Sequence, residues 1–324
     1  MFTLRFDMRS SVQGAPFADL YAAALDMCAY SETRGGVAVI LSEHHAAKDG
    51  HLPSPLMLAS AIAGRTERIA IMLAALVVPL YNPVRLAEDI AVLDIISKGR
   101  AAYVLGVGHR DEEYEHLGVN PRRRGRLADE YTDLVLRLLS GETVTVDGRR
   151  VHVTPAVVGP NGPQLMIAGG SPAAVKRAAR HGLGFVAQAN PPGLLELFES
   201  ESRAHGHEPG PTMFPDNAGP TTAFVADDVD AAWAEIGPYL LHDALMAASY
   251  RRGDDSVASI TSAKTVAELR DSPGAYAIFT PDEAATALRS GRPLPLHPLC
   301  GGLPPALAWP YLERAAAAEA AVNQ

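Results

Sequence analysis

Short apolar runs alternate with amphipathic stretches through the first hundred residues. Val37–Leu41 and Ala101–Leu105 are continuous apolar runs, as expected of strands that are covered on both faces. Between them, Val84–Ile96 carries its large apolar side chains at helical spacing. A regular alternation of strands and helices requires crossover connections, and it therefore predicts an α/β fold with a parallel sheet.

The same pattern continues toward the carboxyl end of the chain. The expected strands are Thr3–Met8, Val37–Leu41, Ile69–Val78, Ala101–Leu105, Gln164–Ala168, Gly184–Gln188, Thr221–Ala226 and Ala275–Phe279. Two helix starts are marked clearly, by Ser54-Pro55 and by Thr280-Pro281-Asp282-Glu283. Eight strand–helix units predict a single (β/α)8 TIM barrel over residues 1–324. The sequence shows no internal repeat and no linker to a second domain.

Two segments depart from this alternation of strands and helices and are expected to be insertions. Thr143–Val146 and Arg150–Val153 flank Asp147-Gly148, a preferred turn pair, which predicts a short hairpin near 143–153. Arg251–Ser262 is polar and begins a variable excursion expected near 250–274.

Composition narrows the possible functions. The net charge of −9 argues against a nucleic-acid partner, because phosphate backbones need a basic surface. Cys28 and Cys300 belong to no metal-spaced cluster, so we expect a reduced, cytoplasmic protein without a metal site. Charged residues interrupt the first nine positions, which excludes a signal-peptide core there, and no apolar run is long enough to span a membrane.

Polar residues gather where the predicted strands end. Ser42-Glu43-His44-His45 directly follows an apolar strand, and in a barrel the carboxyl ends of all strands meet at one mouth. Histidines titrate near neutral pH, and Glu43 could orient or tune one of them. The alternative is that these residues are loop polars that cap the next helix. Asp7, the stretch 106–110 and the stretch 169–171 occupy corresponding strand ends.

A second candidate site is the turn Gly169-Gly170-Ser171-Pro172. It leads into a helix whose free N–H groups suit a phosphate, although many such turns use glycine for geometry alone. The basic run from Arg122 to Arg126 could add an anion clamp, with at most one or two side chains pointing inward. Asp111-Glu112-Glu113 is interpreted as the acidic first turn of a helix. The sequence contains no P-loop, nucleophile elbow or complete dinucleotide-binding fingerprint.

Several segments together resemble the bacterial luciferase-like flavin-dependent monooxygenase superfamily. They are LSEHH (Leu41–His45), AIAGRTERI (Ala61–Ile69), VVPLYNPVRLAEDIAVLDIISKGR (Val77–Arg100), IAGGSPAAVKRAA (Ile167–Ala179) and the closing HPLCGGLPPALAW (His297–Trp309). The resemblance is strongest over about the first 190 residues. It implies a TIM barrel with reduced FMN, or the deazaflavin coenzyme F420, across the mouth.

The resemblance also implies roles for individual residues. His44 matches the superfamily's catalytic histidine, and Glu43 is its candidate catalytic partner. Ala74-Ala75 matches a position where the superfamily holds a non-prolyl cis peptide under the flavin ring. The expected cofactor contacts are Ala74, Ala75, Gly106, His109, Arg110, Arg126, Gly169, Gly170 and Ser171. His109 stands where many relatives carry tyrosine or arginine, so the anion contact could pass to Arg110 or Arg126.

Three functions remain open at this point. The first is a monooxygenase that uses FMN reduced by a separate flavin reductase, since no NAD-binding fingerprint is present, and acts on a small organic substrate with His44 as base or hydrogen-bond donor. The second is an F420-dependent oxidoreductase that transfers hydride without oxygen. The third is a flavin-binding relative without catalysis. The resemblance implies a homodimer in each case.

Overall fold

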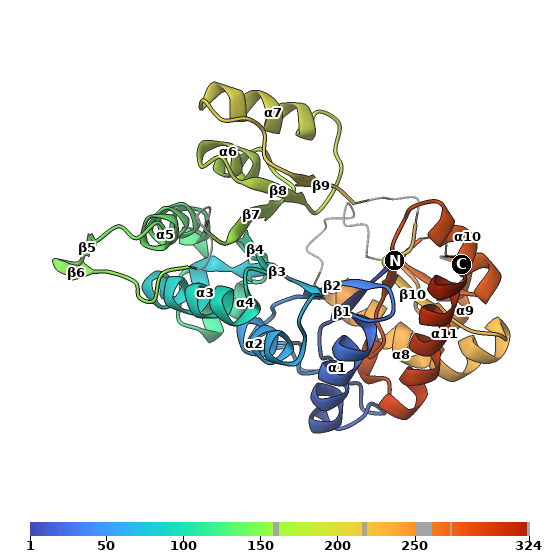
Figure 1. Ribbon diagram of the computed structural model, residues 1–324. Coiled ribbons are helices and arrows are strands. Elements are labelled where there is room, and N and C mark those ends of the chain that lie inside the picture. The colour runs from blue at the N-terminus through green and yellow to red at the C-terminus, as the bar shows by residue number, and fades with distance from the viewer. Residues whose placement is uncertain (158–161, 216–218, 251–260, 273, 323–324) are drawn as a thin grey trace.

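Ten strands form one parallel sheet in the computed structural model (Figure 1), which describes residues 1–157, 162–215, 219–250, 261–272 and 274–322. The strands of this sheet are β1 (Phe2–Phe6), β2 (Gly36–Leu41), β3 (Ala70–Val77), β4 (Ala101–Gly106), β7 (Gln164–Gly169), β8 (Gly184–Ala187), β9 (Thr212–Met213), β10 (Thr222–Val225), β11 (Tyr276–Phe279) and β12 (Leu294–Leu296). Their spatial order is β11-β10-β12-β1-β2-β3-β4-β7-β8-β9. The predicted α/β fold with a parallel sheet is therefore confirmed.

Helices connect the strands, as parallel pairing requires. They are α1 (Phe17–Ser31), α2 (Pro55–Arg65), α3 (Pro83–Ser97), α4 (Asp111–His116), α5 (Arg124–Leu139), α6 (Pro172–Arg180), α7 (Leu194–Ala204), α8 (Val229–Ser249), α9 (Val266–Asp271), α10 (Pro281–Arg289) and α11 (Pro305–Val322), with short 3-10 turns at Val78–Leu80, Pro121–Arg123 and Cys300–Gly302. In Figure 1 the helices α1 to α3 follow the first strands in blue and teal, while α8 to α11 gather in orange and red beside β1 and β10.

The core is centred on β1, which pairs with β2 on one side and β12 on the other. Phe2, Leu4 and Phe6 are fully buried, and they alternate along the strand with Thr3 and Arg5, which are only partly covered. This arrangement fixes the carboxyl end of β1, and with it the neighbouring ends of β2 and β3, as a rigid edge from which polar side chains can project.

The structure corrects the predicted strand count and one strand position. The predicted eighth strand, β11, lies outside β10, and β12 takes the place next to β1. The sequence pattern missed β12 because it has three residues and contains Pro295, and it missed β9 because that strand has two residues. Among the strands that the structure describes, β9 and β11 are the outer ones, and no recorded pairing joins them.

The two predicted insertions differ in outcome. Residues 143–153 form the predicted hairpin, with β5 (Val144–Val146) antiparallel to β6 (Arg149–Val151). Asp147 and Gly148 both have positive φ, as this turn requires. Much of the excursion expected near 250–274 lies outside the described residues, at 251–260. The part that follows contains α9, a helix that the sequence pattern did not predict.

Within the described residues, none of the helices combines the length and the apolar character that a membrane crossing needs.

Candidate active site

A cavity of about 540 Å³ lies at the carboxyl ends of β2, β3, β4, β7 and β8. It is lined by nine of the residues predicted from the sequence, namely Glu43, His44, Ala74, Ala75, Gly106, His109, Gly169, Gly170 and Ser171. Ser42, Val77, Gly125, Ala168, Arg177 and Gln188 also line it. Convergence of strand ends on one cavity is how this class of fold builds its sites, and the volume is typical of a pocket for a cofactor.

One wall of the cavity is apolar and is formed by Ala74, Ala75, Val77 and Gly106. The peptide bond between Ala74 and Ala75 is cis, as the resemblance implied, and the register between β3 and β4 shifts at the same place. Gly106 lies beside this peptide on the neighbouring strand β4, and a Cβ at this position would stand 2.9 Å from the Cβ of Ala75. A side chain at 106 would therefore fill the space beside the cis peptide. This wall can support a planar ring.

His44 faces the cavity and is held by a buried carboxylate from α4. Its Nδ1 lies 2.6 Å from Oε1 of Glu113, whose side chain is fully buried. Burial by itself raises the pKa of Glu113, but hydrogen bonds from His44 and the His45 backbone, together with nearby Arg110, lower it overall. An ionised carboxylate only accepts hydrogen bonds, so Nδ1 of His44 carries the proton in the neutral ring and Nε2 keeps a free lone pair.

Glu43 points away from His44. One carboxylate oxygen lies 2.7 Å from Nε2 of His45, and the other accepts hydrogen bonds from the backbone N–H of Val77 and the hydroxyl of Tyr81. The side chain is nearly fully buried. It therefore joins the loop after β2 to the end of β3, beside the cis peptide. Any catalytic part for Glu43 stays a prediction.

The opposite end of the cavity has the features of an anion site. Ser171 caps α6 by accepting a hydrogen bond from Ala174, and the first N–H groups of a helix have no partner within it. Gly169 is required because a Cβ there would lie 2.5 Å from that of Ala174. Arg177, on the next turn of α6, lines the cavity and is mostly buried. These groups fit a phosphate by hydrogen bonding and by charge.

Arg177 keeps donors available for an anion. Its Nε donates to Asp129 at 2.8 Å, and its Nη2 donates to the carbonyl of Gly125 at 3.2 Å. A guanidinium has five N–H donors, so these two contacts, both with described residues, leave three without a partner in the described part of the chain. Arg177 belongs to the IAGGSPAAVKRAA segment that carries the family resemblance, but it was not among the expected cofactor contacts.

The two arginines that were expected at the anion lie elsewhere. Arg126 is exposed and paired with Glu130 on α5. Arg110 donates to the carbonyl of His45 and to Glu113, and its guanidinium covers the ring of Tyr250 at 4.1 Å. Neither belongs to the residues that line the cavity.

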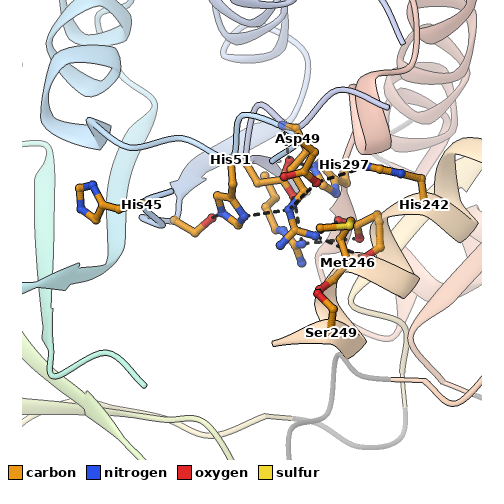
Figure 2. A network of polar contacts seen from close by, with 12 residues as sticks. His45, Asp49, His51, His242, Met246, Ser249 and His297 are labelled. Carbon is orange, nitrogen blue, oxygen red and sulfur yellow. Dashed lines mark hydrogen bonds and ion pairs between the residues drawn. The ribbon is translucent and has the colours of Figure 1, made fainter. Parts of the chain in front are cut away.

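A buried polar network lies beside the cavity and involves residues from the loop after β1, the loop after β2, α8 and the stretch after β12. Arg9 donates to Asp243 at 2.9 Å and to His51 at 2.8 Å, and it lies 3.9 Å from Asp49. Burial by itself raises the pKa of Asp7, but His297, Arg9 and His51 lower it well below its usual value. Figure 2 shows His51, Asp49, His242 and His297 gathered in this network, with His45 apart from them.

Three members of this region have ligand atoms within 4.8 Å of one another, namely Asp243, His297 and Cys300. Both oxygens of Asp243 are already committed, one to Arg9 and the other to the hydroxyl of Tyr276. Burial raises the pKa of the Cys300 thiol well above its usual value, which keeps it protonated. We therefore assign Asp243 and His297 to the ion-pair network, with Cys300 as a neutral thiol beside it.

Comparison with known proteins agrees with this architecture. The family model of luciferase-like monooxygenases matches residues 2–290, and the chain belongs to that family. Limonene 1,2-monooxygenase of Rhodococcus erythropolis is 30% identical over 193 residues, which are 54% of this chain and 47% of that protein. The alkanal monooxygenase alpha chain of a Kryptophanaron alfredi symbiont is 26% identical over 55% of this chain and 53% of its own length. The chain thus spans about half the length of the curated relatives it matches.

Solved structures share the fold. The monooxygenase RslO1 from Streptomyces bottropensis superposes with a TM-score of 0.77 at 22% identity over the full length of both chains. The oxygenating constituent of 3,6-diketocamphane monooxygenase from Pseudomonas putida, in complex with FMN, gives 0.69 at 17% identity over 97% of this chain and 96% of its own. The F420-dependent tetrahydromethanopterin reductase of Methanopyrus kandleri gives 0.52 at 16% identity over 74% and 71%. These likenesses confirm the predicted fold class.

Proposed function

We propose that this protein is a flavin-dependent monooxygenase that uses reduced FMN and molecular oxygen on a small organic substrate. One observation carries the proposal: a single cavity joins an apolar wall at Ala74, Ala75 and Val77, an imidazole held by a buried carboxylate, and an anion cradle at the start of α6. The apolar wall can support the flavin ring, the cradle can hold its phosphate, and the imidazole is available for proton transfer.

The residues present fit FMN. Gly170, Ser171 and Arg177 would hold the phosphate, and Ala74 and Ala75 would support the ring. When bound, reduced FMN supplies the electrons that activate oxygen. The apolar side chains of Ala74, Ala75 and Val77 exclude water from that region, which protects a reactive oxygen species from discharge.

His44 would act at the substrate end of the cavity. Glu113 holds the proton on Nδ1, so Nε2 can accept a proton from the substrate and return it later. The ring of Tyr250 lies 5.1 Å from that of His44, and the ring of His109 lies 5.8 Å from it. Burial is the main cause of a lowered pKa of His109, which favours its neutral form. These rings would surround the reacting atoms.

Titration of the protein with FMN and with F420 tests the cofactor, and oxygen uptake in the presence of a reductase and candidate substrates tests the reaction. Substrate-dependent oxygen uptake with reduced FMN supports the proposal. Tight F420 binding without FMN binding would replace it with hydride transfer, an alternative that the likeness to the F420-dependent reductase favours. A separate flavin reductase is part of the proposal because the sequence shows no NAD-binding fingerprint.

We also propose that the protein is a homodimer that acts in the cytoplasm. Large apolar side chains are exposed on two adjacent helices, Met57 on α2 and Val92, Ile95 and Ile96 on α3. Apolar surface of this kind is typical of a subunit interface, and a second copy of the chain is the partner that the family resemblance implies. Both cysteines are free thiols, as is usual in a reducing compartment.

A further inference from the structure

A hydrogen-bonded chain runs from the buried Arg9 through His51 to Ser42 at the cavity. Nε of Arg9 donates to Nδ1 of His51 at 2.8 Å, and Nε2 of His51 lies 2.9 Å from Oγ of Ser42. Arginine is always a donor and never an acceptor. Nδ1 of His51 must therefore accept, which leaves the neutral ring with its one proton on Nε2. That proton is donated to Ser42.

Arg9 cannot easily turn away from this arrangement. Its guanidinium is held by Asp243 at 2.9 Å, with Asp7 at 3.7 Å and Asp49 at 3.9 Å, and all four side chains are almost completely buried. A buried charge that leaves such partners is strongly disfavoured. The ion pairs of Arg9 therefore determine which ring nitrogen of His51 accepts a hydrogen bond and which one donates.

Burial and the neighbouring charges favour the neutral form of His51. Burial contributes most to lowering its pKa well below the usual value, and Arg9, His44 and Arg5 lower it further, while Asp7 opposes them. A cationic ring would direct a proton on Nδ1 at the N–H of Arg9. Geometry and electrostatics therefore give the same tautomer.

The direction of the hydrogen bond from His51, with Nε2 as the donor, determines what Ser42 can do. A hydroxyl has one donor and two acceptor positions, and Oγ of Ser42 accepts from His51. His51 is the one hydrogen-bond partner recorded for Ser42 Oγ in the described part of the chain, so the hydroxyl hydrogen is free to point elsewhere. Ser42 lines the cavity, as does His44 two positions later, whereas Glu43 turns toward β3.

We propose that Ser42 donates a hydrogen bond to the ring-bearing ligand in the cavity, beside His44, and that His51 and Arg9 are positioning residues that fix this polarity. The inference rests on the proposed function for the identity of the ligand. Its acceptor would be a nitrogen or oxygen atom of the flavin or deazaflavin ring, because Ser42 lies on the imidazole side of the cavity and the phosphate cradle is formed by α6.

The tautomer of His51 can be measured without any cofactor. Histidine nitrogen shifts in the ¹⁵N-labelled full-length protein, recorded from pH 8 to pH 5.5, should show His51 neutral with the proton on Nε2 throughout. His51→Asn identifies the signal by its loss. A proton on Nδ1, or a titration midpoint near 6.5, would overturn the positioning of Ser42 whether or not FMN binds.

The donor itself is tested with FMN and F420, using whichever ligand the wild-type protein binds. Loss of one hydrogen bond in Ser42→Ala should weaken binding about three- to tenfold and shift the ring's absorption band. Ser42→Thr should keep both properties, and Ser200→Ala, an exposed serine on α7, is the matched control. Equal binding by wild type and Ser42→Ala overturns the inference alone. Failure of the wild type to bind either ligand overturns the proposed function, and the donor role of Ser42 with it.

Discussion

Nδ1 of His44 lies 2.6 Å from Oε1 of Glu113, although the two residues are 69 positions apart in the chain. The contact joins the loop after β2 to the short helix α4. Glu113 also accepts from the backbone N–H of His45 and from Arg110, so its carboxylate is a fixed point to which the histidine ring is attached. The orientation of His44 is thus set from the unit that follows β4.

Replacement of this pair should reduce turnover while leaving cofactor binding intact. We expect His44→Ala to lower kcat by about 10²-fold, the usual contribution of a positioned acid or base. Glu113→Gln should lower it by more than about tenfold, because the amide can also donate and no longer selects one tautomer. FMN titration should stay within twofold of the wild type. Unchanged substrate-dependent oxygen uptake in His44→Ala would remove His44 from the mechanism.

Arg177 should contribute to binding through the phosphate alone. Arg177→Gln is expected to weaken FMN binding about ten- to a hundredfold, as loss of a charge-assisted hydrogen bond does, and to leave riboflavin binding unchanged. Arg180→Gln is the matched control, since Arg180 shares the ion pair with Asp129 but is about half exposed. Arg126→Gln should have no effect, because Arg126 lies outside the cavity lining. An FMN defect in Arg126→Gln with none in Arg177→Gln would reverse this assignment.

His51 should make the protein sensitive to mild acid. Its pKa is lowered in the folded state, mainly by burial and by Arg9, so below about pH 6.5 the unfolded chain binds a proton that the folded chain does not. Stability therefore falls as the pH decreases from 6.5, by up to about 1.4 kcal/mol per pH unit. Asp7 and Glu113, whose pKa values are lowered, lose their contributions only below about pH 4.

Urea unfolding of the wild type and of His51→Gln between pH 7.5 and pH 5 measures this effect. The slope of the unfolding free energy with pH should be smaller in the variant, because one of the groups that gains a proton on unfolding is absent. His205→Gln removes an exposed histidine on the turn after α7 and serves as the control. Parallel slopes for wild type and His51→Gln would contradict the prediction.

The apolar surface on α2 and α3 should determine the oligomeric state. Ile96→Glu places a charge beside Ile95 and one turn from Val92 on α3, and it should convert a dimer into a monomer at micromolar concentration. Light scattering coupled to size exclusion measures the mass directly. Leu195→Glu, on α7, alters an equally exposed leucine elsewhere and should leave the mass unchanged. A monomeric wild type would refute the interface.

Local sequence patterns predicted the scaffold well because each signal is carried by neighbouring residues. Thr280 and Glu283 form a capping box at the predicted start of α10, and Asp147-Gly148 forms the expected turn. Strand ends could be located from the change from apolar to polar residues, and this placed His44 and the glycine turn on one cavity. The missed strands β9 and β12 are too short to show a pattern.

Pairings across the cavity could not be predicted in the same way. Glu113 was interpreted as part of an acidic first turn, and which of three consecutive acids faces His44 depends on the rotation of α4. Arg177 and Arg126 both lie on helices near the cavity, and only the packing of α5 against α6 shows which guanidinium turns inward. Neither the Arg9–His51–Ser42 chain nor its polarity has a local signature, because Arg9 lies in the loop after β1 whereas Ser42 and His51 lie in the loop after β2.

The position of β1 has a consequence for synthesis of the protein on the ribosome. One of its two neighbours, β2, emerges soon afterwards, but the other, β12, is the last strand of this sheet to be made. Until then the nascent sheet presents β1 as an open edge with unpaired backbone groups, a template for wrong association. Chains that stop before Leu294 should therefore precipitate or recruit chaperones, even though they contain every residue that lines the cavity.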